Sequence, residues 1–249
     1  MGIEKQQGIV AILDALGASS YSDAEVNTFL RSRERVFERL EEYLEEKTAI
    51  TRNQLKTFTF NDTVVIALVC GQKAPNLKEI TAFSAVLRKF LVESMGSGLL
   101  FRGAAAIGEF RADDGTNTIM GDAVTDAAQW YEQTEWVGVH YTPRSFLKIE
   151  RIMEDASDKK EWALLRCDVP VKSRAPLCTY AVNWPKLFKV EDQRPWDDDD
   201  PPKTKLLDLL ARHKVPLGTE QKYMHTIAFF DFAMDKTKTK KKRTTNKKK

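Results

Sequence analysis

The sequence has 249 residues, of which 42% are hydrophobic, so it is long enough for one large domain or for a domain with an appendage. No apolar run approaches the roughly 20 residues of a membrane-spanning helix, and the N-terminus lacks the charged and then apolar pattern of a signal peptide. The formal net charge is +3, but residues 236–249 hold nine Lys and Arg and no acid, so subtracting these nine leaves −6 for residues 1–235.

The first predicted element is a buried strand at residues 9–13, an apolar run with β-branched residues that is bounded by glycines. The run ends in Asp14, which is followed by small, turn-forming residues. A carboxylate at the end of a buried strand has to be paired, hydrogen-bonded or bound to a metal, because burial of an unpaired charge is costly. Asp14 therefore either caps the turn or the following helix, or it takes part in a binding site.

A long helix and a hairpin are predicted next, at residues 22–47, 55–60 and 63–70. The helix opens with the capping-box pair Ser22 and Glu25 and continues with apolar residues at helical spacing. The two strands enclose the turn pair Asn61-Asp62, which predicts a hairpin. Asp62 is therefore expected at or beside the hairpin tip.

The remaining segments of the main domain alternate between helices and strands. The pattern predicts helices at 75–96, 121–133 and 143–153, and strands at 99–108, 116–120, 137–139, 162–171 and 179–182. Helices that interleave with a sheet containing an antiparallel hairpin indicate an α+β fold, namely a ferredoxin-like sandwich of the split βαβ type.

The composition changes after residue 185, so three regions are predicted. They are a main domain over 1–185, a linker with a small helical extension over 186–235, and a disordered lysine-rich tail over 236–249. The extension contains an acidic run and two short predicted helices, at 203–213 and 220–234. The tail could bind nucleic acid weakly, but the acidic body makes nucleic acid an unexpected partner.

Asp14 and Asp62 are the first candidates for chemistry. Two carboxylates at neighbouring strand and hairpin ends repel each other unless a cation lies between them. Phosphoryl-transfer sites hold Mg²⁺ or Mn²⁺ with few carboxylates and leave the other positions to water and substrate phosphates. The alternative is that these are two unrelated turn aspartates.

Four short motifs stand in order along residues 8–182. They are Asp14-Ala-Leu-Gly17 after a strand, Asn61-Asp62 before an apolar strand, Arg102 six residues before Gly108, and Met120-Gly-Asp-Ala-Val124 at the start of a helix. Together they resemble the catalytic domain of the class III nucleotidyl cyclases, with Met120 in place of that family's aromatic residue. The set is much more specific than any single motif.

This resemblance implies a fold of the class III cyclase type and a homodimer with two sites at the subunit interface. It implies two Mg²⁺ or Mn²⁺ ions per site, held by Asp14 and Asp62 with the Ala15 carbonyl as a further ligand. The residues that it implies for the substrate triphosphate are Arg102 and, in a late basic turn, Lys172 or Arg174.

Two pairs of positions depart from the adenylyl and guanylyl cyclases. Thr125 and Gln129 stand where those enzymes have an Asn and an Arg that stabilise the transition state, and the loss of one such donor costs on the order of 10²–10³ in rate. Phe58 and Thr118 stand where those enzymes have their purine-selecting pair. The ring of Phe58 offers no hydrogen-bond donor or acceptor and fills space that a purine would occupy, while Thr118 offers one hydroxyl.

These departures look like the bacterial Pycsar cyclases. The resemblance therefore implies a lyase that makes cyclic UMP from UTP, or cyclic CMP from CTP, in anti-phage defence, with UTP the preferred substrate. An ordinary position in the hydrophobic core explains the aromatic residue at Phe58 equally well. Other interpretations stay open: a catalytically silent nucleotide-binding domain, a purine cyclase with atypical base contacts, and a protein that binds nucleic acid through its tail.

Three cysteines without metal-site spacing indicate reduced thiols and a cytoplasmic location.

Overall fold

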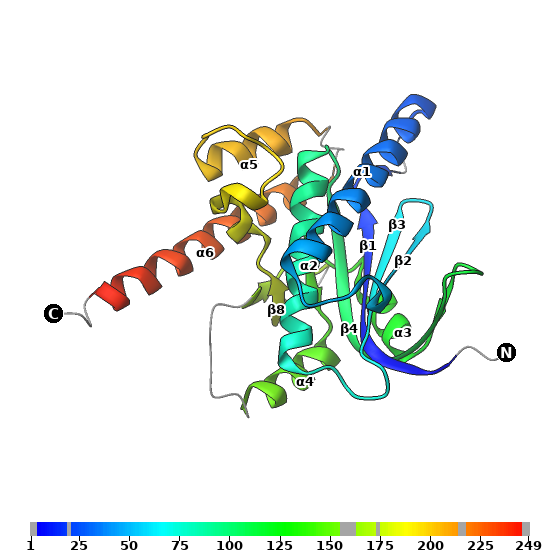
Figure 1. Cartoon of the computed structure of the whole chain (residues 1–249). Coiled ribbons are helices and arrows are strands. Elements are labelled where there is room, and N and C mark those ends of the chain that lie inside the picture. Colours follow the sequence, from blue (N-terminus) through cyan, green and yellow to red (C-terminus); the bar gives the residue numbers. More distant parts are fainter. Residues whose placement is uncertain (1–3, 19–20, 155–162, 173–174, 214–217, 246–249) are drawn as a thin grey trace.

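An eight-stranded sheet forms the centre of the computed structural model, with its main strands in the order β2-β3-β1-β4-β6-β8-β7 and with β5 paired to β4 (Figure 1). The structure describes residues 4–18, 21–154, 163–172, 175–213 and 218–245. The strands are β1 (Gln6–Ala15), β2 (Leu55–Phe60), β3 (Thr63–Val69), β4 (Phe101–Asp113), β5 (Thr118–Met120), β6 (Gly138–Tyr141), β7 (Leu164–Val169) and β8 (Leu177–Val182).

The helices are α1 (Asp23–Lys47), α2 (Leu77–Gly96), α3 (Asp122–Trp130), α4 (Pro143–Glu154), α5 (Pro202–Ala211) and α6 (Glu220–Thr245), with short 3₁₀ turns η2 (Arg52–Gln54), η3 (Trp184–Lys189) and η4 (Glu191–Gln193). Helices α1 to α4 alternate with strands along the chain, and α5 and α6 follow the last strand. The capping box predicted for α1 is confirmed, because the Glu25 carboxylate accepts from the backbone N–H of Ser22 at 2.8 Å. None of the helices in the described ranges is long and apolar enough to cross a membrane.

The first four strands have the ferredoxin-like arrangement. Strand β1 lies between β3 and β4 and pairs antiparallel with both, while β2 and β3 form the predicted hairpin at one edge of the sheet. Helix α1 connects β1 to β2, and α2 connects β3 to β4, so each crosses over a neighbouring strand. The predicted α+β fold class of the split βαβ type is therefore confirmed.

The alternation of residues along β1 gives the sheet two unlike faces. Ile9 and Leu13 belong to a large apolar cluster with α1 and α2, and we call this side the helical face. Val10 and Ile12 belong to a small cluster with Phe58 and residues of α3, and we call this side the open face. Successive side chains of a strand point to opposite faces, so Asp14 lies on the open face.

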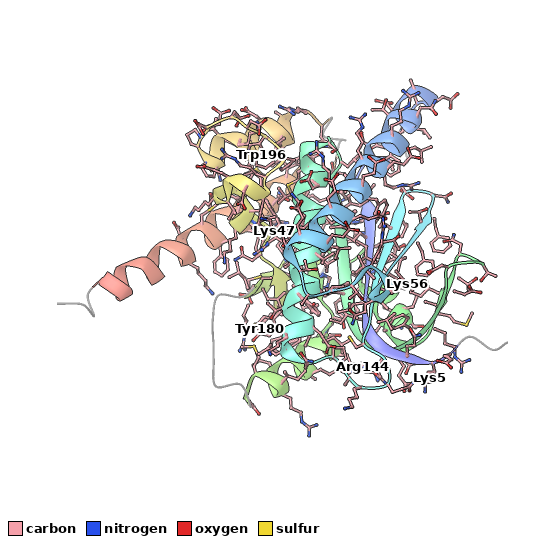
Figure 2. The ribbon with its side chains drawn as sticks, viewed as in Figure 1. Lys5, Lys47, Lys56, Arg144, Tyr180 and Trp196 are labelled. Atoms are coloured by element: carbon pink, nitrogen blue, oxygen red, sulfur yellow. The ribbon has the colours of Figure 1, made fainter. Side chains whose placement is uncertain are left out.

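The C-terminal extension packs into the main core. Phe230 of α6 lies 5.9 Å from Trp184 and 5.2 Å from Phe188, measured between ring centroids. The Phe188 ring also packs on Trp196, with a centroid distance of 4.8 Å. Figure 2 shows Trp196 beside α5. Residues on both sides of the predicted boundary at residue 185 therefore share one core. The backbone of α6 continues as helix to Thr245, into the segment for which a disordered tail is predicted, since lysine is itself a good helix former.

Candidate active site

Asp14 and Arg102 form the centre of the candidate site. They are directly opposite each other in the antiparallel ladder between β1 and β4. Arg102 donates from Nε and Nη2 to the Oδ2 atom of Asp14, at 3.2 and 3.0 Å. Its Nη1 atom donates to the Glu132 backbone carbonyl at 3.1 Å. The guanidinium is thus fixed on both sides by hydrogen bonds, and its residue is only 8% exposed.

The hairpin turn brings Asp62 to the same end of the sheet. The Asp62 carbonyl accepts from the Ala15 backbone N–H at 3.2 Å, and Asp14 pairs in register with Thr63. Asn61 supplies the left-handed position of this two-residue turn, with φ of +53°, which asparagine adopts more readily than most residues. Arg33 of α1 donates to the Asn61 carbonyl at 2.8 Å and holds the turn in place.

The two carboxylates interact electrostatically. Burial raises the pKa of Asp14 above its ordinary value of 3.8, whereas the hydrogen bonds and charge of Arg102 lower it. The negative charge of Asp62 raises the pKa of Asp14 as well. Repulsion of this kind is relieved when a cation binds both groups.

The donor set fits a hard divalent cation that takes its remaining ligands from a bound substrate. Across the described ranges, no cluster of three or more His, Cys, Asp or Glu side chains is arranged to hold a metal by itself. A site completed by phosphates and water needs only one or two protein carboxylates. Both Arg102 bonds to Asp14 go to Oδ2, so Oδ1 takes no part in this ion pair. Ala15, the predicted carbonyl ligand, lies in β1 beside the Asp62 backbone.

The late basic turn also reaches this end of the sheet. The Lys172 backbone N–H donates to the Gln133 carbonyl at 2.8 Å, and Val171 forms a bridge with Thr134. Lys172 therefore contacts the residue next to Glu132, whose carbonyl accepts from Arg102. Its predicted alternative, Arg174, lies outside the described residues.

A further cation, Lys222, comes from α6 and is not indicated by the sequence motifs. Burial is the main reason that the pKa of Lys222 is lowered, and the charges of Arg102 and Lys172 lower it further. Asp14 and Glu135 act in the opposite direction. Lys222 thus lies within electrostatic range of Arg102, Lys172 and Asp14, which come from distant parts of the chain.

Helix α3 points its last turn toward the same site. Burial, the Glu132 carboxylate and the charge of Asp14 together raise the pKa of Tyr131 to about 12, and its hydroxyl donates to Glu132 at 2.9 Å. Thr125 and Gln129, the positions that resemble the family's transition-state residues, lie one turn apart on α3 and are both exposed. Tyr131 and Glu132 are site neighbours that the sequence did not single out.

The two residues predicted to face the base, Phe58 and Thr118, take different places in the fold. Phe58 is 1% exposed and packs in the open-face cluster with Val10 and Val65, which is the core position that the sequence left open. Thr118 pairs with Asp113, eleven strand positions from Arg102, which corresponds to roughly 35 Å of extended strand. One chain by itself therefore does not bring Thr118 to Asp14.

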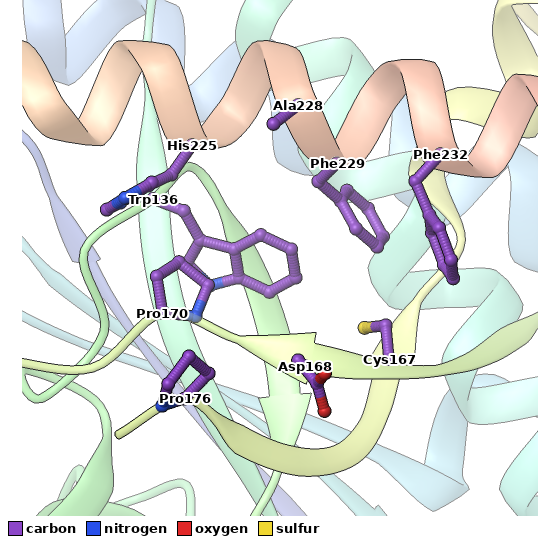
Figure 3. Close-up of a pocket in the computed structure, with 9 residues that line it drawn as sticks. All are labelled: Trp136, Cys167, Asp168, Pro170, Pro176, His225, Ala228, Phe229 and Phe232. Atoms are coloured by element: carbon purple, nitrogen blue, oxygen red, sulfur yellow. The ribbon is translucent and has the colours of Figure 1, made fainter. Parts of the chain in front are cut away.

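A separate cavity of about 360 Å³ lies beneath α6 (Figure 3). It is lined by Trp136, Cys167, Asp168, Pro170, Pro176, His225, Ala228, Phe229 and Phe232. Among the described residues, its lining includes none of the predicted site residues and no Lys or Arg that could bind phosphate.

Comparisons with known proteins give distant structural likenesses. No protein-family model matches the chain, and no curated protein matches it in sequence. The catalytic core of a rhodopsin-guanylyl cyclase with converted specificity, in complex with ATPalphaS, is similar with a TM-score of 0.44 and 12% identity, over 73% of this chain and 98% of that one. An adenylate/guanylate cyclase/hydrolase from Silicibacter pomeroyi is similar with a TM-score of 0.36 and 16% identity, over the same shares of the two chains.

Proposed function

We propose that this chain is a nucleotidyl cyclase, which converts a nucleoside triphosphate to its 3′,5′-cyclic nucleotide and pyrophosphate. The observation that carries the proposal is the convergence of Asp14 and Asp62 with three cations, Arg102, Lys172 and Lys222, at one end of the sheet. A polyphosphate accompanied by divalent cations requires both kinds of charge within a few ångströms. The order of the four sequence motifs supports the same reaction.

In this proposal Asp14 and Asp62 hold Mg²⁺ or Mn²⁺, which when bound activates the ribose 3′-hydroxyl and neutralises charge on the α-phosphate. Arg102 and Lys172 bind phosphate oxygens, with Arg174 as the alternative in the same basic turn. The Glu132 carbonyl keeps the guanidinium of Arg102 at the site when the charge of Asp14 is taken over by a cation. Arg102 would then be able to bind phosphate oxygens while it remains held at the site.

We further propose a homodimer with two sites. Phe60, on the open face of the hairpin, is 44% exposed, and Met120, in β5, is 52% exposed. Exposure of these apolar side chains to water is unfavourable, and a partner surface would remove it. A second copy would also provide Thr118, Thr125 and Gln129 to a site that is incomplete in one chain. This arrangement is the one that the resemblance to class III cyclases implies.

The substrate we propose is a pyrimidine nucleotide, UTP before CTP, and the product a signal in anti-phage defence. The support is chemical: Phe58 stands where the purine cyclases have Lys or Glu, and Thr118 stands where they have Asp or Cys. Because Phe58 is buried, it would act by filling the volume beneath the base and thereby reject the larger purine ring.

A second candidate is a cyclase-like domain that binds nucleotide without turning it over. The observation that favours it is the uncharged pair Thr125 and Gln129, both exposed on α3 where a transition-state cation is expected. A silent domain would keep the carboxylates and the phosphate-binding cations, so it would still bind nucleotide, but it would not catalyse cyclisation.

Incubation of the full chain with each of the four radiolabelled nucleoside triphosphates and Mn²⁺ separates these candidates. We expect a phosphatase-resistant cyclic product from UTP or CTP, which is lost in Asp62→Asn and retained in the control Asp208→Asn, whose residue is exposed on α5. Binding without product in every case would support the silent domain. Equal turnover of ATP and UTP would exclude the pyrimidine preference.

A further inference from the structure

A chain of hydrogen bonds connects α6 to the strand beside Arg102. Arg102 pairs in register with Gly138 at the start of β6. The backbone N–H of Val137, the preceding residue, donates to the Thr226 hydroxyl oxygen at 2.8 Å. That hydroxyl donates in turn to the Lys222 carbonyl at 2.6 Å. Lys222 is therefore held one helical turn from a residue that is itself fixed to the site.

Other contacts fix the same turn of α6. The Nδ1 atom of His225 lies 2.8 Å from the Glu135 carbonyl, and Thr226 is fully buried. The Phe229 ring meets Trp136 edge-on, with a centroid distance of 4.5 Å. Figure 3 shows His225 and Phe229 extending from α6 toward the segment that carries Trp136. These contacts leave the first turns of α6 little freedom to move away from the sheet.

The charges around Lys222 indicate a site for an anion. Lys222 is half-buried and lies among Arg102 and Lys172, whose charges repel it. By contrast, two other lysines of the extension have partners: Lys203 binds the Asp231 carboxylate at 2.6 Å, and Lys205 pairs with Asp198. Within the described ranges, no carboxylate forms an ion pair with Lys222. Cations held close to one another are stabilised when a polyanion binds them.

We infer that Lys222 is a substrate-binding residue, which contacts the terminal phosphates of a nucleoside triphosphate together with Arg102 and Lys172. The inference rests on the proposed function for the identity of the substrate. It makes the C-terminal helix a part of the nucleotide site, and it assigns a role to the extension over residues 186–235. Lys222 would hold the same phosphates as they leave as pyrophosphate.

The test uses inorganic tripolyphosphate as the probe, because its binding does not depend on cyclisation. We would measure its affinity by titration calorimetry with Mg²⁺ for the full chain, for Lys222→Gln and Lys222→Arg, and for the matched control Lys203→Gln. Lys222→Gln should weaken binding by about tenfold or more, the range for a charge-assisted hydrogen bond. Lys222→Arg should retain most of the affinity, and Lys203→Gln should match the unmodified chain.

Steady-state kinetics give a second measurement. Lys222→Gln should raise KM for the nucleotide in the same proportion as the tripolyphosphate affinity falls, with a smaller change in kcat. Unchanged or tighter tripolyphosphate binding in Lys222→Gln would overturn the inference, even if the chain cyclises nucleotides. Weaker binding in a chain that makes no cyclic product would uphold the inference and overturn the proposed reaction. No binding by the unmodified chain would overturn both.

Discussion

The two faces of the sheet are built from alternate residues of the same strands, yet they differ in almost every other respect. The helical face is covered by α1, α2 and the C-terminal extension, and its cluster contains most of the buried aromatic residues. The open face has a small cluster covered mainly by α3. Asp14 and Arg102 both point to the open face. One face thus stabilises the fold, while the other is left accessible for binding.

The largest expected effect separates two neighbouring residues of β1. Asp14→Asn should reduce formation of the cyclic product by roughly 10³-fold, because the charge that holds the cation is lost. Leu13→Ala, on the helical face, should leave the activity of the folded protein unchanged but cost about 2–5 kcal/mol in the free energy of unfolding. Product assays and denaturant unfolding of both variants test this. A folded Leu13→Ala protein that lost as much activity as Asp14→Asn would contradict the assignment of stability to the helical face and binding to the open face.

A second comparison uses two buried phenylalanines. Phe90→Ala, in α2, should destabilise the protein by about 3–5 kcal/mol, because the surrounding helices cannot close the cavity. Phe58→Ala should cost less, since its cluster is small and bordered by the short helix α3. It should also raise turnover of purine relative to pyrimidine triphosphates. Denaturant midpoints and substrate competition measure the two effects. An unmoved purine-to-pyrimidine ratio would leave Phe58 as a core residue only.

The open face also contains a buried histidine. His140 is fully buried, and burial lowers its pKa from 6.5 to about 4, while its hydrogen bond to the Gly103 carbonyl acts in the opposite direction. The unfolded chain therefore takes up a proton between pH 6.5 and pH 4 that the folded chain does not. Stability should fall across this window as the pH decreases, by up to about 3 kcal/mol from this residue. His140→Gln, which keeps a donor for Gly103, should show a shallower fall in melting temperature. Parallel pH profiles for the two proteins would rule out this role for His140.

The smallest expected effect concerns the lysine-rich segment. Deletion of residues 236–249 should leave turnover unchanged at moderate salt, because these residues contain no apolar side chain to pack against a site. Initial rates of the full and shortened chains at two salt concentrations measure this. A loss of activity on deletion would assign the segment to the site rather than to the surface.

Local patterns in the sequence predicted most of the fold. The capping box at Ser22 and the turn pair Asn61-Asp62 each depend on neighbours within three residues, so the chain itself contains the information. The Asp14–Arg102 ion pair depends on the register between two strands about ninety residues apart, which no local pattern determines. The sequence therefore predicted that Arg102 binds phosphate, but it did not predict that Arg102 pairs with Asp14 when no substrate is bound.

Lys222 shows a stronger form of the same limit. Nothing in the run Glu220-Gln-Lys222 distinguishes this lysine from the others in the extension. Its place near Arg102 follows from the Val137–Thr226 hydrogen bond, which joins segments 89 residues apart. The length of α6 is a related case. Composition indicates solubility, whereas helix length also depends on the packed residues that precede the tail.

The ion pair between Asp14 and Arg102 has a kinetic consequence. The resting site supplies its own counterion, so a divalent cation that arrives alone has to compete with a guanidinium that the Glu132 carbonyl also retains. A cation that arrives already bound to a polyphosphate brings negative charge for Arg102 to accept in exchange. Under the proposed function, entry of the two together is therefore favoured over stepwise loading, and the metal affinity measured without nucleotide should be lower than the affinity measured with nucleotide present.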